Sequence, residues 1–329
     1  MKNIIKRRLS YKIGYMNRSY KKPLVVIRCT TYNHEAYIRD ALDGFVMQQT
    51  NFPFVAVVHD DASTDNTAAI IREYASRYPE VILPIYETEN QYSKHDGSLR
   101  RIMNNACTAT GAKYIALCEG DDYWTDPSKL QKQVDFLEAH PEYSLCFHNA
   151  IVHYENKNID DHLFADLQTR EYSEKEIADG WITATASFLF RQSVYHSKYY
   201  TEYTRSDKFI VGDYPLMMSL LREGRAFALE QPYSVYRINK NGWTQRKHLT
   251  IKKIMQEIEV DRIFGGYAGI AAKNNVAIQS REALSLIKHG EINNALKVFW
   301  ISFNFAPRQT IKANIKFIIN LIRSRLSIQ

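Results

Sequence analysis

Cysteine is scarce in this chain, with four in 329 residues. They are Cys29, Cys107, Cys118 and Cys146, and no two stand at the close spacing of zinc ligands. Three of them lie in apolar runs, which is typical of buried, reduced thiols. The sequence therefore argues against a disulfide framework, and we expect the protein to work in a reducing compartment.

Long apolar runs are also missing. No stretch reaches the roughly 18 uninterrupted apolar residues of a membrane span. The basic N-terminus lacks the apolar block of a signal peptide, so we expect it to remain in the mature chain. We expect a cytoplasmic protein, either free or held peripherally on the cytoplasmic face of the inner membrane.

Acidic residues are absent from both ends of the chain. Residues 1–22 carry eight Lys or Arg and residues 292–329 carry six, with no Asp or Glu in either segment. Because the formal charge of the whole chain is +7, the part between these ends is acidic, at −7. An acidic body argues against a nucleic-acid groove, so we expect no nucleic-acid partner.

Neither glycine-rich phosphate motif occurs: G-x-x-x-x-G-K-[ST] and G-x-G-x-x-G are both absent. A diphosphate bound by this chain would therefore be held by other means. A divalent metal on carboxylate oxygens is one such means, and Mg²⁺ or Mn²⁺ suits those hard ligands.

What is present is a regular alternation of strand and helix patterns through residue 140. It predicts an α/β fold with a doubly wound, mainly parallel sheet, flanking helices and a C-terminal helical extension. We expect a basic leader at 1–22, a main domain at 23–247 and a helical extension at 248–329. The expected strands are Leu24–Thr30, Phe54–Val58, Val81–Tyr86, Tyr114–Cys118, Leu145–His153, Ile182–Phe190, and one or two within Ala226–Ile238.

Two acidic clusters follow predicted buried strands. Asp60 and Asp61 follow the second strand, where paired acids are most often turn or helix-cap residues. Glu119, Asp121 and Asp122 follow the fourth strand. Three carboxylates so close together repel one another, and this repulsion is usually offset by a cation or by several hydrogen-bond donors. This cluster predicts a metal site at the carboxyl edge of the sheet, with a solvated loop as the alternative.

Four segments together carry a resemblance to a known family. They are "VVIRCTTYNHEAYI", "VVHDDASTDNT", "GAKYIALCEGDDYW" and "VGDYPLM", and they follow one another between about residues 23 and 245. In this order they resemble the family 2 glycosyltransferases of the GT-A fold, of the type that builds bacterial surface glycans.

The resemblance implies a nucleotide-sugar pocket. It implies that Thr30, Tyr32 and Glu35 line the pocket, and that Asp61 binds the base, which is commonly uracil. It further implies donor and metal roles for Asp121 and Asp122, with Mn²⁺ or Mg²⁺ as the cofactor. The triplet here reads Glu119-Gly120-Asp121 with Asp122 following, so the division of the metal contacts stays open.

The resemblance also implies a catalytic base at Asp213, which deprotonates the acceptor hydroxyl in an inverting transfer. From its position alone, Asp213 is an N-cap at the start of a predicted helix. The loop Tyr236–Gln245 is expected to close over the donor, with Arg237 or Trp243 meeting substrate. The Q-x-x-R-W motif of processive synthases is absent, so we expect a non-processive enzyme.

The C-terminal segment has an amphipathic pattern. Its isoleucines recur at helical spacing beside lysine and arginine, which suits either an anionic membrane surface or packing against the main domain. The isoleucines are Ile311, Ile315, Ile318 and Ile322.

The sequence thus predicts an inverting, metal-dependent glycosyltransferase acting on a nucleotide-sugar donor, with UDP as the expected nucleotide. The expected acceptor is a hydroxyl of a glycan or of a lipid-linked glycan in surface polysaccharide synthesis. Two alternatives remain: a non-catalytic nucleotide-sugar binding module, and a nucleotidyltransferase, which also uses metal and carboxylates on an α/β sheet.

Overall fold

The computed structural model describes residues 22–155, 157–239, 250–288 and 290–315. The expected basic leader up to residue 21, Trp243, and Ile318 and Ile322 lie outside the described residues. The described residues form two compact units. The first takes its residues from 22–172, 182–197 and 220–239, and the second takes its residues from 173–181, 198–219 and 250–315.

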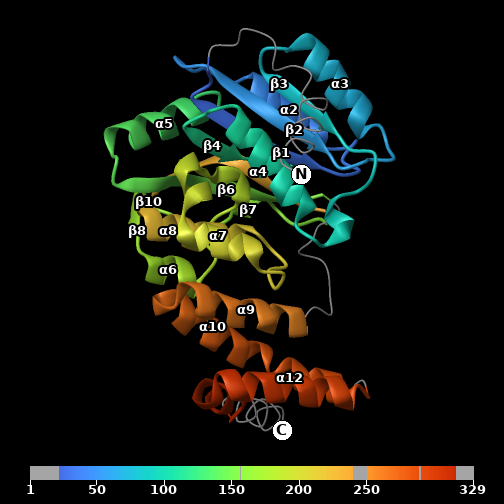
Figure 1. Ribbon diagram of the computed structural model, residues 1–329, viewed down its shortest axis with the longest axis vertical. Coiled ribbons are helices and arrows are strands. Elements are labelled where there is room, and N and C mark those ends of the chain that lie inside the picture. The colour runs from blue at the N-terminus through green and yellow to red at the C-terminus, as the bar shows by residue number, and fades with distance from the viewer. Residues whose placement is uncertain (1–21, 156, 240–249, 289, 316–329) are drawn as a thin grey trace, which may run out of the picture. The chain divides into compact units, whose positions relative to one another are not determined.

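The first unit is built on a ten-stranded mixed sheet (Figure 1). Its main strand order is β3-β2-β1-β4-β9-β6-β10-β5, with β7 beside β6 and β8 beside β10. The strands are β1 (Val25–Thr31), β2 (Phe54–Asp60), β3 (Ile82–Tyr86), β4 (Tyr114–Leu117), β5 (Tyr123–Trp124), β6 (Tyr143–Tyr154), β7 (His162–Leu163), β8 (Arg170–Tyr172), β9 (Leu189–Arg191) and β10 (Arg225–Ile238).

The first four strands are parallel, as the alternating pattern predicts. The helices that connect them are α2 (Ile38–Val46), α3 (Thr67–Arg77) and α4 (Ser98–Ala109), and α5 (Lys129–Ala139) follows β5. Apolar residues from α2, α3 and α5 pack with alternate residues of β1, β2 and β4 in one core. The carboxyl ends of β1, β2 and β4 therefore meet along one edge of the sheet.

Beyond β4 the sheet becomes mixed. Strand β9 is antiparallel to both β4 and β6, whereas β10 runs parallel to β6 with register shifts near Pro232. The predicted strand Ile182–Phe190 is wrong over most of its length. Residues Thr185–Ser187 form a 3-10 turn because the hydroxyls of Thr183 and Ser187 bond to each other and the Ser187 amide bonds to the Ala184 carbonyl.

The second unit is helical, as expected for the C-terminal part. Its helices include α6 (Glu174–Asp179), α7 (Lys198–Arg205), α9 (Thr250–Phe264), α10 (Gly266–Gln279), α11 (Glu282–Lys288) and α12 (Ile292–Phe305). Helix α8 (Asp213–Glu223) begins in this unit and ends in the first. Within the described ranges, no helix is both long and apolar enough to cross a bilayer.

Candidate active site

The acidic segment after β4, residues 119–122, is held against the end of β1 by backbone and side-chain hydrogen bonds. The Gly120 amide donates to the Thr30 carbonyl at 3.0 Å, and the Thr30 hydroxyl donates to the Glu119 carboxylate. A Cβ at residue 120 would lie 2.5 Å from Thr31 Cγ2, so the close approach requires glycine. Thr30 therefore anchors the acidic segment at the sheet edge.

Asp121 and Asp122 are each held through one carboxylate oxygen. Asn239 Nδ2 donates to Asp121 Oδ2 at 3.1 Å, and the Arg237 backbone amide donates to Asp122 Oδ1 at 2.9 Å. Arg237 lies at the end of β10 and Asn239 directly follows the strand, more than 110 residues later in the chain than the acids they bind. The other oxygen of each carboxylate has no hydrogen-bond partner among the described residues.

Arg237 fixes this arrangement with its side chain as well. The guanidinium donates to the Asp121 carbonyl, bonds to Asp40 on α2, and forms an ion pair with Glu155 at 2.8 Å. The rings of Tyr37 and Tyr123 lie 5.1 and 4.6 Å from its central carbon. Arg237 is only 8% exposed, so its guanidinium is committed to protein groups in the described structure.

Electrostatics at this edge favour a bound cation. Burial, and then the neighbouring Asp121 charge, raise the pKa of Asp122 well above its ordinary value. Burial also raises the pKa of Glu119. A divalent cation would offset the repulsion between these carboxylates, and the unengaged hard oxygens of Asp121 and Asp122 fit Mg²⁺ or Mn²⁺. No group of three or more metal-binding side chains occurs in the described part of the chain.

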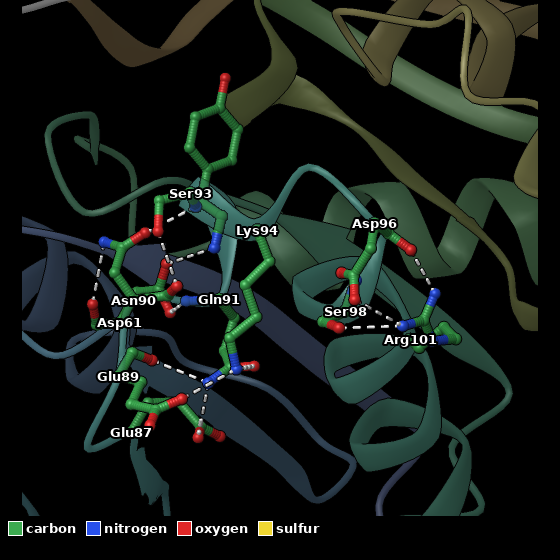
Figure 2. A network of polar contacts seen from close by, with 11 residues as sticks. Asp61, Glu87, Glu89, Asn90, Gln91, Ser93, Lys94, Asp96, Ser98 and Arg101 are labelled. Atoms are coloured by element: carbon green, nitrogen blue, oxygen red, sulfur yellow. Dashed lines mark hydrogen bonds and ion pairs between the residues drawn. The ribbon is translucent and has the colours of Figure 1, made fainter.

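Asp61 lies at the same edge, and its carboxylate holds the next loop in place (Figure 2). The Asp61 amide donates to the Thr31 carbonyl at 3.0 Å. Its Oδ1 and Oδ2 accept from the backbone amides of Gln91 and Tyr92, at 2.7 and 2.9 Å, and the residue is 2% exposed. Each oxygen keeps a second lone pair for a further donor.

Glu35 and Tyr32 belong to the loop that follows β1. The Glu35 carboxylate accepts from the amide of Asn66 at 2.9 Å, and the Glu35 amide donates to Asp65 at 3.0 Å. Glu35 thus stabilises the start of α3. Tyr32 is 45% exposed and is free to contact a ligand at the sheet edge.

Asp213 is the first residue of α8 and lies in the second unit. It is half-buried, and its Oδ1 accepts from the Tyr214 amide at 2.8 Å. The expected N-cap role is therefore wrong in detail: Asp213 is itself the first helical residue and bonds the next amide, whereas an N-cap accepts from the second or third amide of the helix. Burial raises the pKa of Asp213, which makes its carboxylate a better proton acceptor than an ordinary aspartate.

The sequence does not reveal the residues that hold the acidic pair, Asp121 and Asp122. Asn239 lies in the predicted loop Tyr236–Gln245, but its own role was not predicted, and Asp40 and Glu155 belong to no acidic cluster in the sequence. Arg237 was expected to meet substrate. A single sequence contains no signal for bonds that span more than 110 residues.

A profile of the glycosyl transferase family 2 matches residues 27–223, which is more than half of the chain. The chain belongs to this family. The match contains Asp61, the acidic segment and Asp213, and it ends before Arg237.

Several other proteins resemble the chain over shorter segments. An uncharacterised protein of Mycobacterium tuberculosis is 49% identical over 126 residues, which are 38% of this chain and 35% of that protein. TuaG of Bacillus subtilis, named as a teichuronic acid biosynthesis glycosyltransferase, is 32% identical over 116 residues, which are 35% of this chain and 42% of TuaG. The match to the mycobacterial protein thus spans about a third of that protein's length.

The fold of this family 2 chain is similar to that of S. aureus TarS in complex with UDP-GlcNAc. The TM-score is 0.59, with 15% sequence identity and coverage of 88% of each chain. This likeness confirms the predicted GT-A fold.

Proposed function

We propose that the chain is an inverting, metal-dependent, non-processive glycosyltransferase that uses a nucleotide-diphosphate sugar. The observation that carries the proposal is the adjacent pair Asp121 and Asp122 at the carboxyl edge of the sheet, each with one unengaged oxygen. Membership of family 2 and the fold of a protein crystallised with UDP-GlcNAc support it.

Asp121 and Asp122 would hold Mn²⁺ or Mg²⁺, and the bound ion supplies charge neutralisation for the departing diphosphate. Asp122 would hold the ion with the carboxylate oxygen that the Arg237 amide leaves unengaged. Asp121, oriented by Asn239, would also contact the donor near its ribose. Arg237 keeps both carboxylates in place without touching the donor.

Thr30, Tyr32, Glu35 and Asp61 would line the nucleotide pocket. Asp61 is already bonded to two loop amides, so it accepts from the base through its remaining lone pairs. This arrangement suits uracil, whose N3–H is a single donor, and UDP is therefore the proposed nucleotide.

Asp213 is the proposed catalytic base. It takes the proton from the acceptor hydroxyl while that oxygen bonds to the anomeric carbon. The bond from this carbon to the diphosphate oxygen breaks on the opposite face, so the configuration inverts and a nucleoside diphosphate leaves. The raised pKa of Asp213 fits this role.

The proposed acceptor is a hydroxyl on a glycan or a lipid-linked glycan of a surface polysaccharide. The teichuronic acid name of TuaG supports this class of pathway. We assign transfer to residues 23–247 and an accessory role to the helical extension 248–329. The basic ends favour a peripheral position on the cytoplasmic face of the inner membrane.

Product analysis tests the proposal against its two alternatives. The purified chain is incubated with UDP-sugars, Mn²⁺ and an acceptor extract. A glycosyltransferase releases UDP only when acceptor is present, whereas a nucleotidyltransferase would transfer UMP from the same donor and release the sugar 1-phosphate. Donor binding without any turnover would identify a binding module, and release of sugar 1-phosphate would exclude the proposed reaction.

A further inference from the structure

The last long helix of the second unit, α12, exposes an apolar face. Five large side chains on it are 41–67% exposed, with Trp300 the most exposed. At about 100° per residue they fall within an arc about 100° wide. We call this the α12 face; its residues are Ile292, Leu296, Phe299, Trp300 and Phe303.

The opposite side of α12 is already used for folding. Ala295, Val298 and Ser302 are buried, and the first two belong to a core shared with α9, α10 and α11. The exposed arc is therefore the solvent side of α12. On the surface the rings of Phe299 and Phe303 stack, with their centroids 6.1 Å apart.

The chain continues the same surface chemistry beyond α12. Residues 307–315 are helical, with Thr310 buried and bonded to the Ser302 carbonyl, whereas Ile311 and Ile315 are 46% and 53% exposed. From Ile292 to the end the sequence contains six Lys or Arg and no acid. Exposed Lys297 lies beside the arc, at its Trp300 side.

We propose that the α12 face binds the interfacial region of an anionic lipid bilayer. Its aromatic and aliphatic side chains enter the boundary between headgroups and acyl chains, while the neighbouring cations contact lipid phosphates. Trp300 suits this position because an indole has an apolar body and a polar N–H. The proposal rests on the proposed function only in its choice of an anionic cytoplasmic leaflet.

A second copy of this chain is a less suitable occupant. A two-fold interface would bring the same surface of each copy together. Lys297, Arg308 and Lys312 would then face an equally basic, acid-free segment, and like charges across an interface are unfavourable. An anionic lipid surface complements both the charge and the apolar arc.

Vesicle co-sedimentation of the full chain tests the proposal. The vesicles contain phosphatidylcholine alone or phosphatidylcholine mixed with phosphatidylglycerol. We expect the unchanged chain to bind the mixed vesicles. The Leu296→Ser/Trp300→Ser variant should bind them at least about tenfold more weakly. Lys297→Gln should reduce the dependence of binding on salt.

Tyr267→Ser/Ile278→Ser is the matched control, since these residues of α10 are 52% and 54% exposed. It should bind within about twofold of the unchanged chain. Equal losses in both variants, or no binding by the unchanged chain, would overturn the proposal. Light scattering gives a further test. If the unchanged chain is an oligomer that the α12 substitutions dissociate, while vesicle binding persists, the proposal is also overturned.

Thermal stabilisation by UDP-sugar and Mn²⁺ serves as a separate measurement of the transfer site. The α12 variants should retain it, because their altered side chains lie on the surface. Loss of vesicle binding with unchanged thermal stabilisation by donor would therefore show that the substitutions affect the α12 face and not the transfer site. A failure of donor binding in every variant would instead count against the proposed function.

Discussion

At the residue scale, Arg237 has the largest set of partners near the acidic pair. Its guanidinium contacts two carboxylates, one carbonyl and two tyrosine rings, and its amide holds Asp122. A lysine retains the positive charge but lacks the planar fork that makes several bonds at once. The geometry of Arg237 therefore matters more than its charge.

We expect Arg237→Lys to lower the free energy of unfolding by about 2 kcal/mol, because it breaks charged hydrogen bonds at a buried position. Metal-dependent donor binding should weaken in parallel as Asp121 loses support. Urea unfolding and donor titrations measure the two effects. Arg39→Lys is the control: its paired bonds to Glu73 are half exposed, so the change should stay within about 0.5 kcal/mol. Equal effects in both variants would contradict the role given to Arg237.

Gly120→Ala should damage the site through steric conflict. Its new methyl group would lie 2.5 Å from Thr31 Cγ2 and 2.9 Å from His34 Nδ1. We expect a loss of about 1–3 kcal/mol in stability and weaker donor binding. Gly180→Ala is the control, since a methyl group there would meet no atom within 4 Å and the backbone is extended. Normal donor binding by Gly120→Ala would show that the acidic segment tolerates displacement.

Asp213→Asn should separate binding from chemistry. We expect donor stabilisation to remain and kcat to fall by about 100-fold or more, since the amide cannot accept the proton. In the unchanged chain kcat should rise with pH through the raised pKa of Asp213, because only the carboxylate is active. Steady-state assays across pH measure both. Persistent transfer by Asp213→Asn would remove it from the mechanism.

At the element scale, the sequence predicts strands better than turns and long-range partners. The runs at β1, β2, β3 and β4 are recognisable because each is short, apolar and followed by a polar turn. Residues 182–188 also contain apolar residues, but the hydroxyls of Thr183 and Ser187 bond to each other and turn the backbone before β9 begins. The acidic segment was also predictable, whereas its support from β10 was not, since tertiary pairing leaves no local pattern.

Helix α5 contains a buried amine that periodicity does not reveal. Lys129 is fully buried, its Nζ lies 3.8 Å from the Trp124 ring centroid, and Nζ has no hydrogen-bond partner in the described residues. Burial lowers the pKa of Lys129 from 10.5 to about 7. Cys118, Cys146 and His148 are the titratable groups around it.

Lys129→Met should therefore stabilise the protein in a pH-dependent way. Between about pH 7 and 10.5 the unfolded lysine keeps a proton that the folded one has lost, so stability of the unchanged chain rises with pH. The gain from Lys129→Met should reach up to about 5 kcal/mol at pH 7 and below, and vanish near pH 10.5. Urea unfolding at several pH values measures it. Lys132→Met, on the exposed side of α5, is the control; a gain independent of pH would contradict the assignment.

At the scale of the whole molecule, the chain has four cysteines and all are buried and free. Burial raises the pKa of each thiol, so the reactive thiolate is suppressed as well as covered.

A thiol-reactive chromophore such as Ellman's reagent should therefore label no cysteine quickly in the native protein and all four after unfolding in urea. The labelling rate reports opening of the native structure, and donor with Mn²⁺ should slow it further. A rapidly labelled thiol in the native chain would contradict the described burial.

The bond between Asp122 and the Arg237 amide spans 115 residues, which also sets an order of events during synthesis. A ribosome adds roughly 5–20 residues per second, so Arg237 is added on the order of ten seconds after Asp122. During that interval β1, β2 and β4 are complete, but the acidic pair has no support from β10. The nascent chain therefore acquires an organised acidic pair only near the end of its sheet domain, and we expect unfinished chains to be unable to consume nucleotide sugar.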